Sequence, residues 1–197
     1  MAKPADGAAM DAMDALRVFA ANRGDAIVVT TMSSGRGWAA VSTRPELDLP
    51  ISGAMGKASS VALGLAMARP ERRVIVLDGD GSLLMNLGSL VTIAGMAPPN
   101  LLHAVCQNGV YEITGGQPIP GAEKVDFAAL ALAAGYRRAE AFADAATLEA
   151  RLPELLGADG PTFATLFVRP FTWDDPGTRR RTADAVAELT AALARAR

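Results

Sequence analysis

The sequence is poor in cysteine, histidine and aromatic residues, and it carries almost no net charge. One cysteine among 197 residues cannot form an internal disulfide, which suits a reducing compartment and predicts a cytoplasmic protein. The formal charge of −2 argues against a surface for nucleic acid or for an anionic membrane. No apolar run approaches the length of a membrane span, and the amino-terminal residues lack the apolar core of a signal peptide. We therefore expect a chain with no nucleic-acid or membrane partner.

What the chain does contain is enough apolar sequence for one core of ordinary size. Half of the residues are apolar and a fifth are charged, which is typical of a globular protein. The length fits a single domain over residues 1–197. No internal repeat or low-complexity linker divides it.

Segments with strand-like and helix-like patterns alternate along the chain. Apolar, β-branched runs predict strands, and apolar residues at helical spacing predict helices. The alternation predicts a mainly parallel sheet with helices on both faces, an α/β three-layer sandwich. The expected strands are 26–31, 74–78, 101–106, 136–139 and 162–168, with a short extended piece at 49–51, and the expected helices are 10–23, 56–68, 83–95, 126–134, 144–156 and the tail from 182.

Two polar clusters directly follow neighbouring predicted strands. Asp-Gly-Asp-Gly-Ser occupies 78–82, and Cys-Gln-Asn-Gly-Val-Tyr occupies 106–111. In a parallel α/β sheet the carboxyl ends of neighbouring strands meet at one crevice, where ligands bind. Asp80 and Asn108 are therefore expected at the same edge of the sheet.

These residue types suit a metal ion and a phosphate. The carboxylate of Asp80 and the amide oxygen of Asn108 are hard donors, and magnesium usually takes one or two carboxylates and completes its shell with water and substrate phosphate. Gly79 and Gly81 leave the backbone bare for a bulky anion. Ser82 begins the next helix, whose free N–H groups favour phosphate. These residues together predict a magnesium ion that bridges the protein to a diphosphate.

The spacing of the two clusters resembles the signature of thiamine-diphosphate-dependent enzymes. In their diphosphate-binding domain, Gly-Asp-Gly is followed after about two dozen residues by Asn-Asn. Here Gly-Asp-Gly lies at 79–81, residues 82–106 intervene, and Gln-Asn lies at 107–108, so the first Asn is replaced. The alternative is two ordinary turns between strand and helix. The resemblance, which covers about 25–170, implies thiamine diphosphate and Mg²⁺, with metal ligands from the side chains of Asp80 and Asn108 and the backbone carbonyl of Val110.

The segment after the first predicted strand, residues 30–36, is expected to be a loop at the same crevice. In the family this position supplies hydroxyl groups to the diphosphate, which makes Ser33 or Ser34 a candidate. The alternative is a serine-rich turn that binds nothing. Gly-x-Gly-x-x-Ala at 35–40 also matches a dinucleotide fingerprint loosely, but the acidic residue required about 20 positions on is missing.

Residues 52–56 resemble the Gly-x-Met-Gly element of the same enzymes. By this resemblance the carbonyl of Gly53 accepts a hydrogen bond from the 4′-amino group of the cofactor. Met55 would hold the cofactor in its bent conformation, although a methionine here is also a candidate core residue. The cofactor contacts implied in total are Ser33, Ser34, Gly53, Met55, Gly79, Asp80, Gly81, Ser82, Asn108, Val110 and Tyr111.

A long loop, 109–121, is a candidate lid over the crevice. Its Thr-Gly-Gly-Gln at 114–117 resembles the small decarboxylase subunits for sulfopyruvate and phosphonopyruvate, and also the β subunits of 2-oxoacid:ferredoxin oxidoreductases. The latter need cysteines for iron–sulfur clusters, and Cys106 alone cannot ligate one. The resemblance thus favours a decarboxylase, with Arg36, Thr114 and Gln117 as substrate contacts.

The resemblance also implies that the active site is shared. Family members use a glutamate from a pyrimidine-binding domain to activate the cofactor, and residues 1–197 contain no second domain of that kind. We therefore expect a hetero-oligomer with a pyrimidine-binding (alpha) subunit. No proton donor to the product is assigned; Glu112 is the nearest candidate. A carboligase like acetolactate synthase, an oxidoreductase subunit, a dinucleotide-binding module and a non-catalytic scaffold subunit remain as alternatives.

The remaining candidate residues are expected to have no part in the chemistry. His103 is interpreted as a hydrogen-bonded interior residue and Cys106 as a small buried hydrophobe. The arginines at 179–181 are interpreted as a solvated face, and Trp173 as a candidate interface residue.

Overall fold

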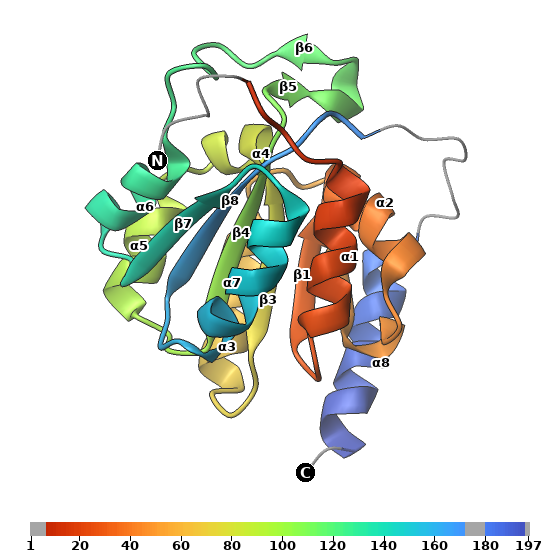
Figure 1. Cartoon of the computed structure of the whole chain (residues 1–197). Helices are drawn as coiled ribbons and strands as arrows, with labels where there is room; N and C mark the ends of the chain where they lie inside the picture. The colour runs from red at the N-terminus through yellow and green to blue at the C-terminus, as the bar shows by residue number, and fades with distance from the viewer. Residues whose placement is uncertain (1–6, 172–179, 196–197) are drawn as a thin grey trace.

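The computed structural model describes residues 7–171 and 180–195 of the chain, and its centre is one parallel sheet. The six strands lie in the order β2-β1-β3-β4-β8-β7, and every neighbouring pair is parallel (Figure 1). The predicted α/β fold is confirmed. The strands are β1 (Ile27–Thr31), β2 (Asp48–Ile51), β3 (Val74–Gly79), β4 (Leu101–Gln107), β7 (Arg138–Phe142) and β8 (Thr162–Phe167).

The central strands are apolar on both sides because each side of the sheet is covered. In β3, Val74 and Val76 belong to one buried cluster, and Ile75 and Leu77 belong to the other. Such strands appear as continuous apolar runs in the sequence.

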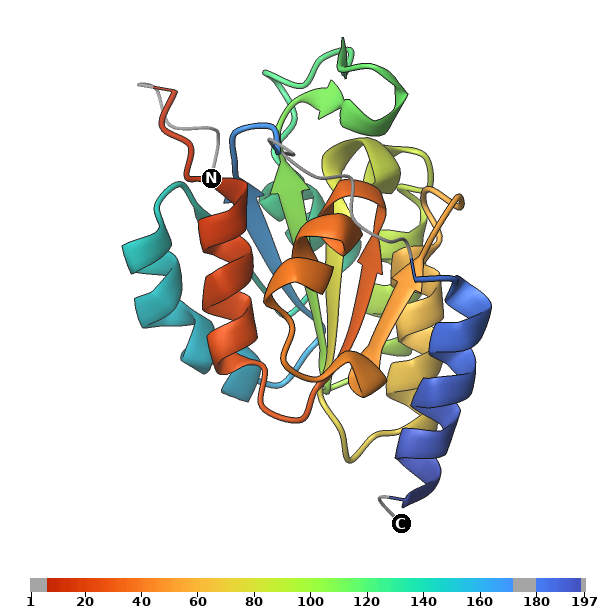
Figure 2. The ribbon, with the colours of Figure 1, turned by 90° about the vertical axis from the view of Figure 1, so that its right-hand side faces the viewer.

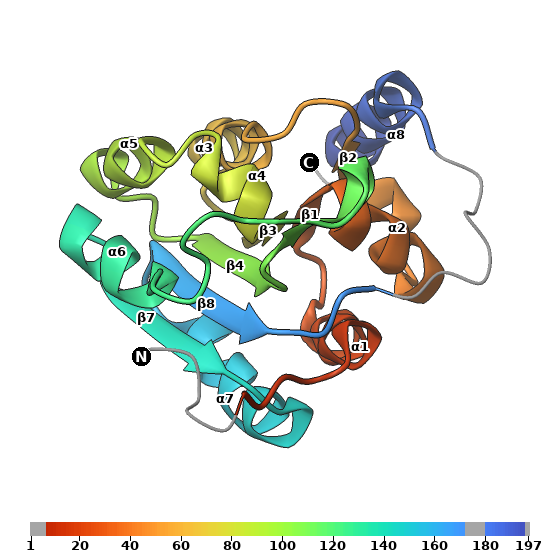
Figure 3. The same ribbon diagram turned by 90° about the horizontal axis from the view of Figure 1, so that it is seen from above.

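Helices form the two outer layers, as the view from above shows (Figure 3). The short helix α4 (Asp80–Leu84) starts where β3 ends. One face is covered by α1 (Ala12–Asn22), α2 (Met32–Val41) and α7 (Ala145–Gly157), and the other by α3 (Ala58–Ala68), α5 (Ser89–Met96), α6 (Phe127–Ala134) and α8 (Thr182–Arg195).

Three of the expected elements differ in the structure. Residues 30–36, expected as a loop, contain the start of α2, because Thr31 and Ser34 form a capping box that begins the helix. The single helix expected over 83–95 is divided into α4 and α5. The weak strand expected at 136–139 is β7, two residues later, because Tyr136 follows the left-handed cap Gly135 and is buried in the core.

Helix α8 lies along the edge strand β2, as seen from the side (Figure 2). Arg180 donates to the carbonyl oxygens of Pro45 and Asp48 at 2.7 and 3.1 Å, and Thr182 Oγ donates to the carbonyl of Pro50 at 2.8 Å. The interpretation of these arginines as a solvated face is therefore wrong for Arg180, which anchors the helix. Trp173 lies outside the described residues.

His103 and Cys106 are interior residues, as predicted. His103 is fully buried on β4, with Nδ1 3.3 Å from the Tyr136 hydroxyl and Nε2 3.5 Å from Asp78 Oδ2. Burial raises the pKa of the Cys106 thiol to about 12, so the thiol is unreactive at neutral pH. Among the described residues, no helix has the length and apolar character needed to cross a membrane.

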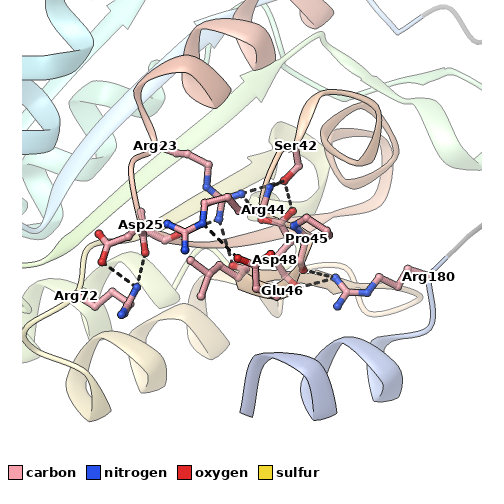
Figure 4. Close-up of polar contacts among 11 residues, drawn as sticks. Arg23, Asp25, Ser42, Arg44, Pro45, Glu46, Asp48, Arg72 and Arg180 are labelled. Atoms are coloured by element: carbon pink, nitrogen blue, oxygen red, sulfur yellow. Dashed lines mark hydrogen bonds and ion pairs between the residues drawn. The ribbon is translucent and has the colours of Figure 1, made fainter. Parts of the chain in front are cut away.

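A buried ion pair holds together the amino ends of β1 and β2, at the opposite end of the sheet from the Gly-Asp-Gly motif (Figure 4). Arg23 donates to Asp48 Oδ1 at 2.6 Å, to Ser42 Oγ at 3.0 Å and to the carbonyl of Ala26 at 2.7 Å. The Arg23 and Asp48 side chains are only 2% and 8% exposed, and the guanidinium lies 5.3 Å from the centre of the Trp38 ring. This pair is therefore structural.

Replacing Arg23 by methionine is expected to lower the free energy of unfolding by about 3–5 kcal/mol, because the Asp48 carboxylate then stays buried without its cation. Arg44→Met is the control, since its pair with Glu46 is exposed and contributes at most about 1 kcal/mol. Urea unfolding curves of both variants measure the difference. Equal losses would contradict the assignment.

Candidate active site

A pocket opens at the carboxyl ends of β1, β3 and β4, where the sequence predicts a ligand crevice. Most of the predicted site residues line this pocket, and three of them, Gly53, Arg36 and Gln117, do not. Those that line it are Ser33, Ser34, Met55, Gly79, Asp80, Gly81, Ser82, Asn108, Val110, Tyr111, Glu112 and Thr114.

Asp80 is the first residue of α4 and is 3% exposed. Its Oδ1 accepts from the Gly81 amide at 2.8 Å, and its Oδ2 accepts from the Gly109 amide at 2.7 Å. Burial raises the pKa of this carboxyl from 3.8 to about 6, and the backbone hydrogen bonds limit the rise. The side chain therefore joins the end of β3 to the loop after β4.

Asn108 follows β4 and faces the same pocket. Its Oδ1 accepts from the Val110 amide at 3.0 Å, and its Nδ2 donates to Glu112 Oε2 at 3.4 Å. Val110 belongs to β5 (Val110–Tyr111), which pairs with β6 (Gln117–Pro118). The loop expected as a lid is thus a short hairpin above the sheet (Figure 1).

The donor set fits a hard divalent cation. Asp80 makes no ion pair with any described residue, and the pocket lining contains no lysine, arginine or histidine. A buried carboxylate without a counter-charge is costly, and a cation would offset that cost. No group of three or more His, Cys, Asp or Glu side chains in the described part of the chain could hold a metal. A site here would therefore use one carboxylate with amide and carbonyl oxygens, which suits Mg²⁺.

The segment carrying Met55 is tied to α4. The Gly56 amide donates to Ser82 Oγ at 2.9 Å, and Asn86 Nδ2 donates to the Gly56 carbonyl at 2.8 Å. Gly56 has φ of +75°, and a Cβ there would lie 2.9 Å from Asn86 Cβ, so only glycine fits. Ser82 accepts this bond and keeps its own proton to donate to an anion in the pocket.

The two predicted serines have different partners. Ser34 Oγ lies 2.6 Å from the carbonyl oxygens of both Thr31 and Leu77, so its proton is used to hold α2 against β3. The Ser33 hydroxyl hydrogen-bonds the Glu112 carboxylate, which places it at the pocket wall.

Glu112 is half-buried beside Asn108. Burial raises the pKa of its carboxyl, while the Ser33 hydroxyl, the Phe171 amide and the charge of Arg36 act in the opposite direction. Arg36 lies on α2 outside the pocket lining. Its charge is close enough to Glu112 to act on the pKa of that carboxyl.

Thr114 and Gln117 close their own turn. Gln117 Nε2 donates to the Thr114 carbonyl at 2.8 Å, and Thr114 Oγ donates to the Tyr111 carbonyl at 3.2 Å. Both side chains are exposed, and only Thr114 reaches the pocket lining.

Sequence reasoning missed five lining residues. Phe171, the most distant in sequence, lies four residues after β8. Its position beyond the carboxyl end of a sheet strand, where the crevice was expected, is the signal that could have identified it. The others are Thr31, Met32, Cys106 and Ile113.

The dinucleotide fingerprint at 35–40 does not form a phosphate-binding turn. These residues lie inside α2, and a Cβ on Gly37 would lie 2.5 Å from Leu16 Cδ1 and 3.0 Å from Phe171 Cε1. Gly37 therefore allows α1 and α2 to pack closely.

These features define a class: parallel α/β proteins with a candidate ligand pocket at the carboxyl ends of their strands. Residues 27–165 match the family model of the thiamine pyrophosphate enzyme C-terminal TPP binding domain, and the chain belongs to that family. The predicted resemblance is confirmed.

Similar proteins include enzymes of two named activities. The chain is 42% identical over 165 residues to a phosphonopyruvate decarboxylase of Streptomyces viridochromogenes, covering 84% of this chain and 41% of the relative. It is 46% identical over 124 residues to the sulfopyruvate decarboxylase subunit beta of Methanothermobacter thermautotrophicus, covering 63% of each. A structure of a putative thiamin diphosphate-dependent enzyme from Mycobacterium smegmatis has a TM-score of 0.71 and 27% identity, covering 82% of this chain and 32% of that one. The chain thus spans only part of each relative.

The raised pKa of Asp80 predicts a pH-dependent stability of the chain without metal or cofactor. Between pH 4 and 6 the folded chain holds a proton that the unfolded chain has lost, so the free energy of unfolding falls as pH rises through this interval, by at most about 3 kcal/mol. Asp80→Asn lacks this titration. The difference in unfolding free energy between wild type and variant, measured at several pH values, should therefore change across the interval; a constant difference would contradict the prediction.

Proposed function

We propose that this chain is the diphosphate-binding subunit of a thiamine-diphosphate- and Mg²⁺-dependent decarboxylase. Its substrate would be a 2-oxo acid of the sulfopyruvate or phosphonopyruvate type, because relatives 42% and 46% identical carry those names. The observation that carries the proposal is the buried Asp80 carboxylate, which lies without a counter-charge against the Asn108–Gly109 backbone, inside a segment of the matching family.

In this proposal the side chains of Asp80 and Asn108 and the carbonyl of Val110 hold the metal. The hydroxyls of Ser33 and Ser82 and the bare backbone at Gly79 and Gly81 would face the diphosphate. Met55 and Tyr111 would contact the organic part of the cofactor, and the Gly53 carbonyl would orient its pyrimidine. When bound, the cofactor would supply the sink for the electron pair that stays on the carbonyl carbon as carbon dioxide leaves, and the protein would supply binding and orientation.

We also propose Thr114, Arg36 and Gln117 as substrate contacts. Of these three residues, only Thr114 lines the pocket. Arg36 would have to move into the pocket to meet a sulfonate or phosphonate. We propose Glu112 as the acid that delivers a proton to the product, because it lines the pocket and burial raises the pKa of its carboxyl.

The activating glutamate would come from a pyrimidine-binding (alpha) subunit in a cytoplasmic hetero-oligomer. The name of one relative, subunit beta, supports such a division. Residues 1–197 would then be a single diphosphate-binding domain, with its core at about 25–170.

The test is a decarboxylation assay of the full chain with thiamine diphosphate and Mg²⁺, alone and with the pyrimidine-binding polypeptide that copurifies from the native source. We expect carbon dioxide from sulfopyruvate or phosphonopyruvate only with both polypeptides present. Turnover by the chain alone would contradict the shared site. Acetolactate as product, or turnover that needs an electron acceptor, would favour the carboligase or oxidoreductase alternative.

A further inference from the structure

One helical surface of the chain carries no charge. No aspartate, glutamate, lysine or arginine occurs from residue 81 to 111, nor within α3 or α6. Helices α3, α5 and α6 lie side by side on one face of the sheet (Figure 3). The opposite face differs, because α7 exposes Glu149, Arg151 and Glu154 to solvent.

The outer side of α3 and α5, together with Met85 at the end of α4, exposes large apolar side chains. Met67 is 52% exposed, Met85 58%, Val91 65% and Met96 50%. We call this surface the α3–α5 face and define it by Gly64, Met67, Met85, Val91, Gly95 and Met96. A helix that is apolar on all sides is normally buried, and contiguous apolar patches mark interaction sites.

Two glycines of this face have no function within the chain. Gly64 is inside α3 and Gly95 is inside α5; both are exposed, and a Cβ on either would meet no described atom within 4 Å. Glycine is unfavourable inside a helix, and neither position needs it for packing or for an unusual φ. A glycine at such a position permits the backbone of another molecule to approach closely.

The α3–α5 face is continuous with the rim of the cofactor pocket. Met85 directly follows α4, which begins with Asp80. The next residue, Asn86, donates to the Gly56 carbonyl beside Met55. A molecule seated on this face therefore also reaches the mouth of the pocket.

We infer that the α3–α5 face is the docking surface for the polypeptide that completes the cofactor site, an inference that rests on the proposed function. The chain spans 41% of one relative and 63% of another, and the family model describes a C-terminal domain, so the relatives contain further protein that residues 1–197 do not match. The uncharged surface predicts an apolar helical surface on that partner, without fixed charges at its centre.

The test uses the full chain and the pyrimidine-binding polypeptide that restores decarboxylation. Val91→Glu and Gly95→Gln are expected to weaken partner binding at least about 10-fold, because the first buries a charge and the second fills the approach space. Gly95→Gln should raise the Tm of the isolated chain by roughly 2 °C, since glutamine favours a helix. A purely structural role for Gly95 would instead lower the Tm. Turnover at saturating partner should be retained.

Val186→Glu is the matched control, because Val186 is 47% exposed on α8, a helix that also carries Asp184 and Glu188. It should leave partner affinity within about 2-fold.

Unchanged affinity of Val91→Glu and Gly95→Gln for the partner, in a complex that still decarboxylates, would overturn the docking surface and leave the proposed function standing. If Val91→Glu instead separates a dimer of the isolated chain without affecting partner binding, a second copy occupies the face and the inference is wrong. If no polypeptide restores turnover, the proposed function fails and the inference falls with it.

Discussion

Asp80→Asn is expected to lower the Mg²⁺-dependent affinity for thiamine diphosphate by roughly 100-fold or more. The substitution keeps the size of the side chain and removes its negative charge, which no described residue balances. In the wild type, the backbone amides of Gly81 and Gly109 donate to the Asp80 carboxylate. The NH₂ group of the asparagine would face one of these amides, so that two donors would oppose each other. Isothermal titration calorimetry with and without Mg²⁺ measures the loss.

The control for Asp80 is Asp144→Asn, the same substitution at a carboxylate that caps α7 by accepting from the Thr147 amide at 2.8 Å. It should change thiamine diphosphate affinity by less than about 2-fold, because it lies away from the pocket. If Asp80→Asn binds the cofactor as tightly as wild type at every Mg²⁺ concentration, the metal assignment is wrong.

Gly81→Ala is expected to displace the β5–β6 hairpin and to weaken cofactor binding about 10-fold or more. A Cβ at this position would lie 2.6 Å from Tyr111 Cδ1 and 3.4 Å from the buried Ile119 Cδ1. The hairpin carries Val110, so its movement would shift a proposed metal ligand. Overpacking of this kind costs about 1–3 kcal/mol, which urea unfolding would detect.

A double-mutant cycle with Tyr111→Ala separates this clash from other effects of the extra methyl group. With the ring removed, Gly81→Ala should cause little further loss of stability, so the two effects should be strongly non-additive. Gly157→Ala is the control for the general effect of replacing a helical glycine by alanine, because a Cβ at Gly157 would meet no atom within 4 Å. Fully additive effects at Gly81 and Tyr111 would show that the contact does not limit this position.

The central strand–helix–strand unit was predictable because its signals are local. Continuous apolar runs indicate strands buried on both faces, and small polar residues follow each of them. Strand ends of a parallel sheet meet at one edge, which brings Asp80 and Asn108 into one pocket. The start of α2 was missed because a capping box outweighed the loop-like composition of residues 30–36.

The sequence by itself thus determined the α/β class and the family signature at 79–81 and 107–108, from which the donors proposed for a metal are taken. Only the tertiary structure decided that the Ser34 hydroxyl is engaged within the protein, since it donates to the carbonyl of Leu77, a residue 43 positions away. It also decided that the charge of Arg36 acts on Glu112 and that Gly37 permits the close packing of α1 against α2. The physical reason is that hydrogen-bond partners, burial and close approach depend on segments distant in sequence, whereas strand and turn patterns are set by neighbouring residues.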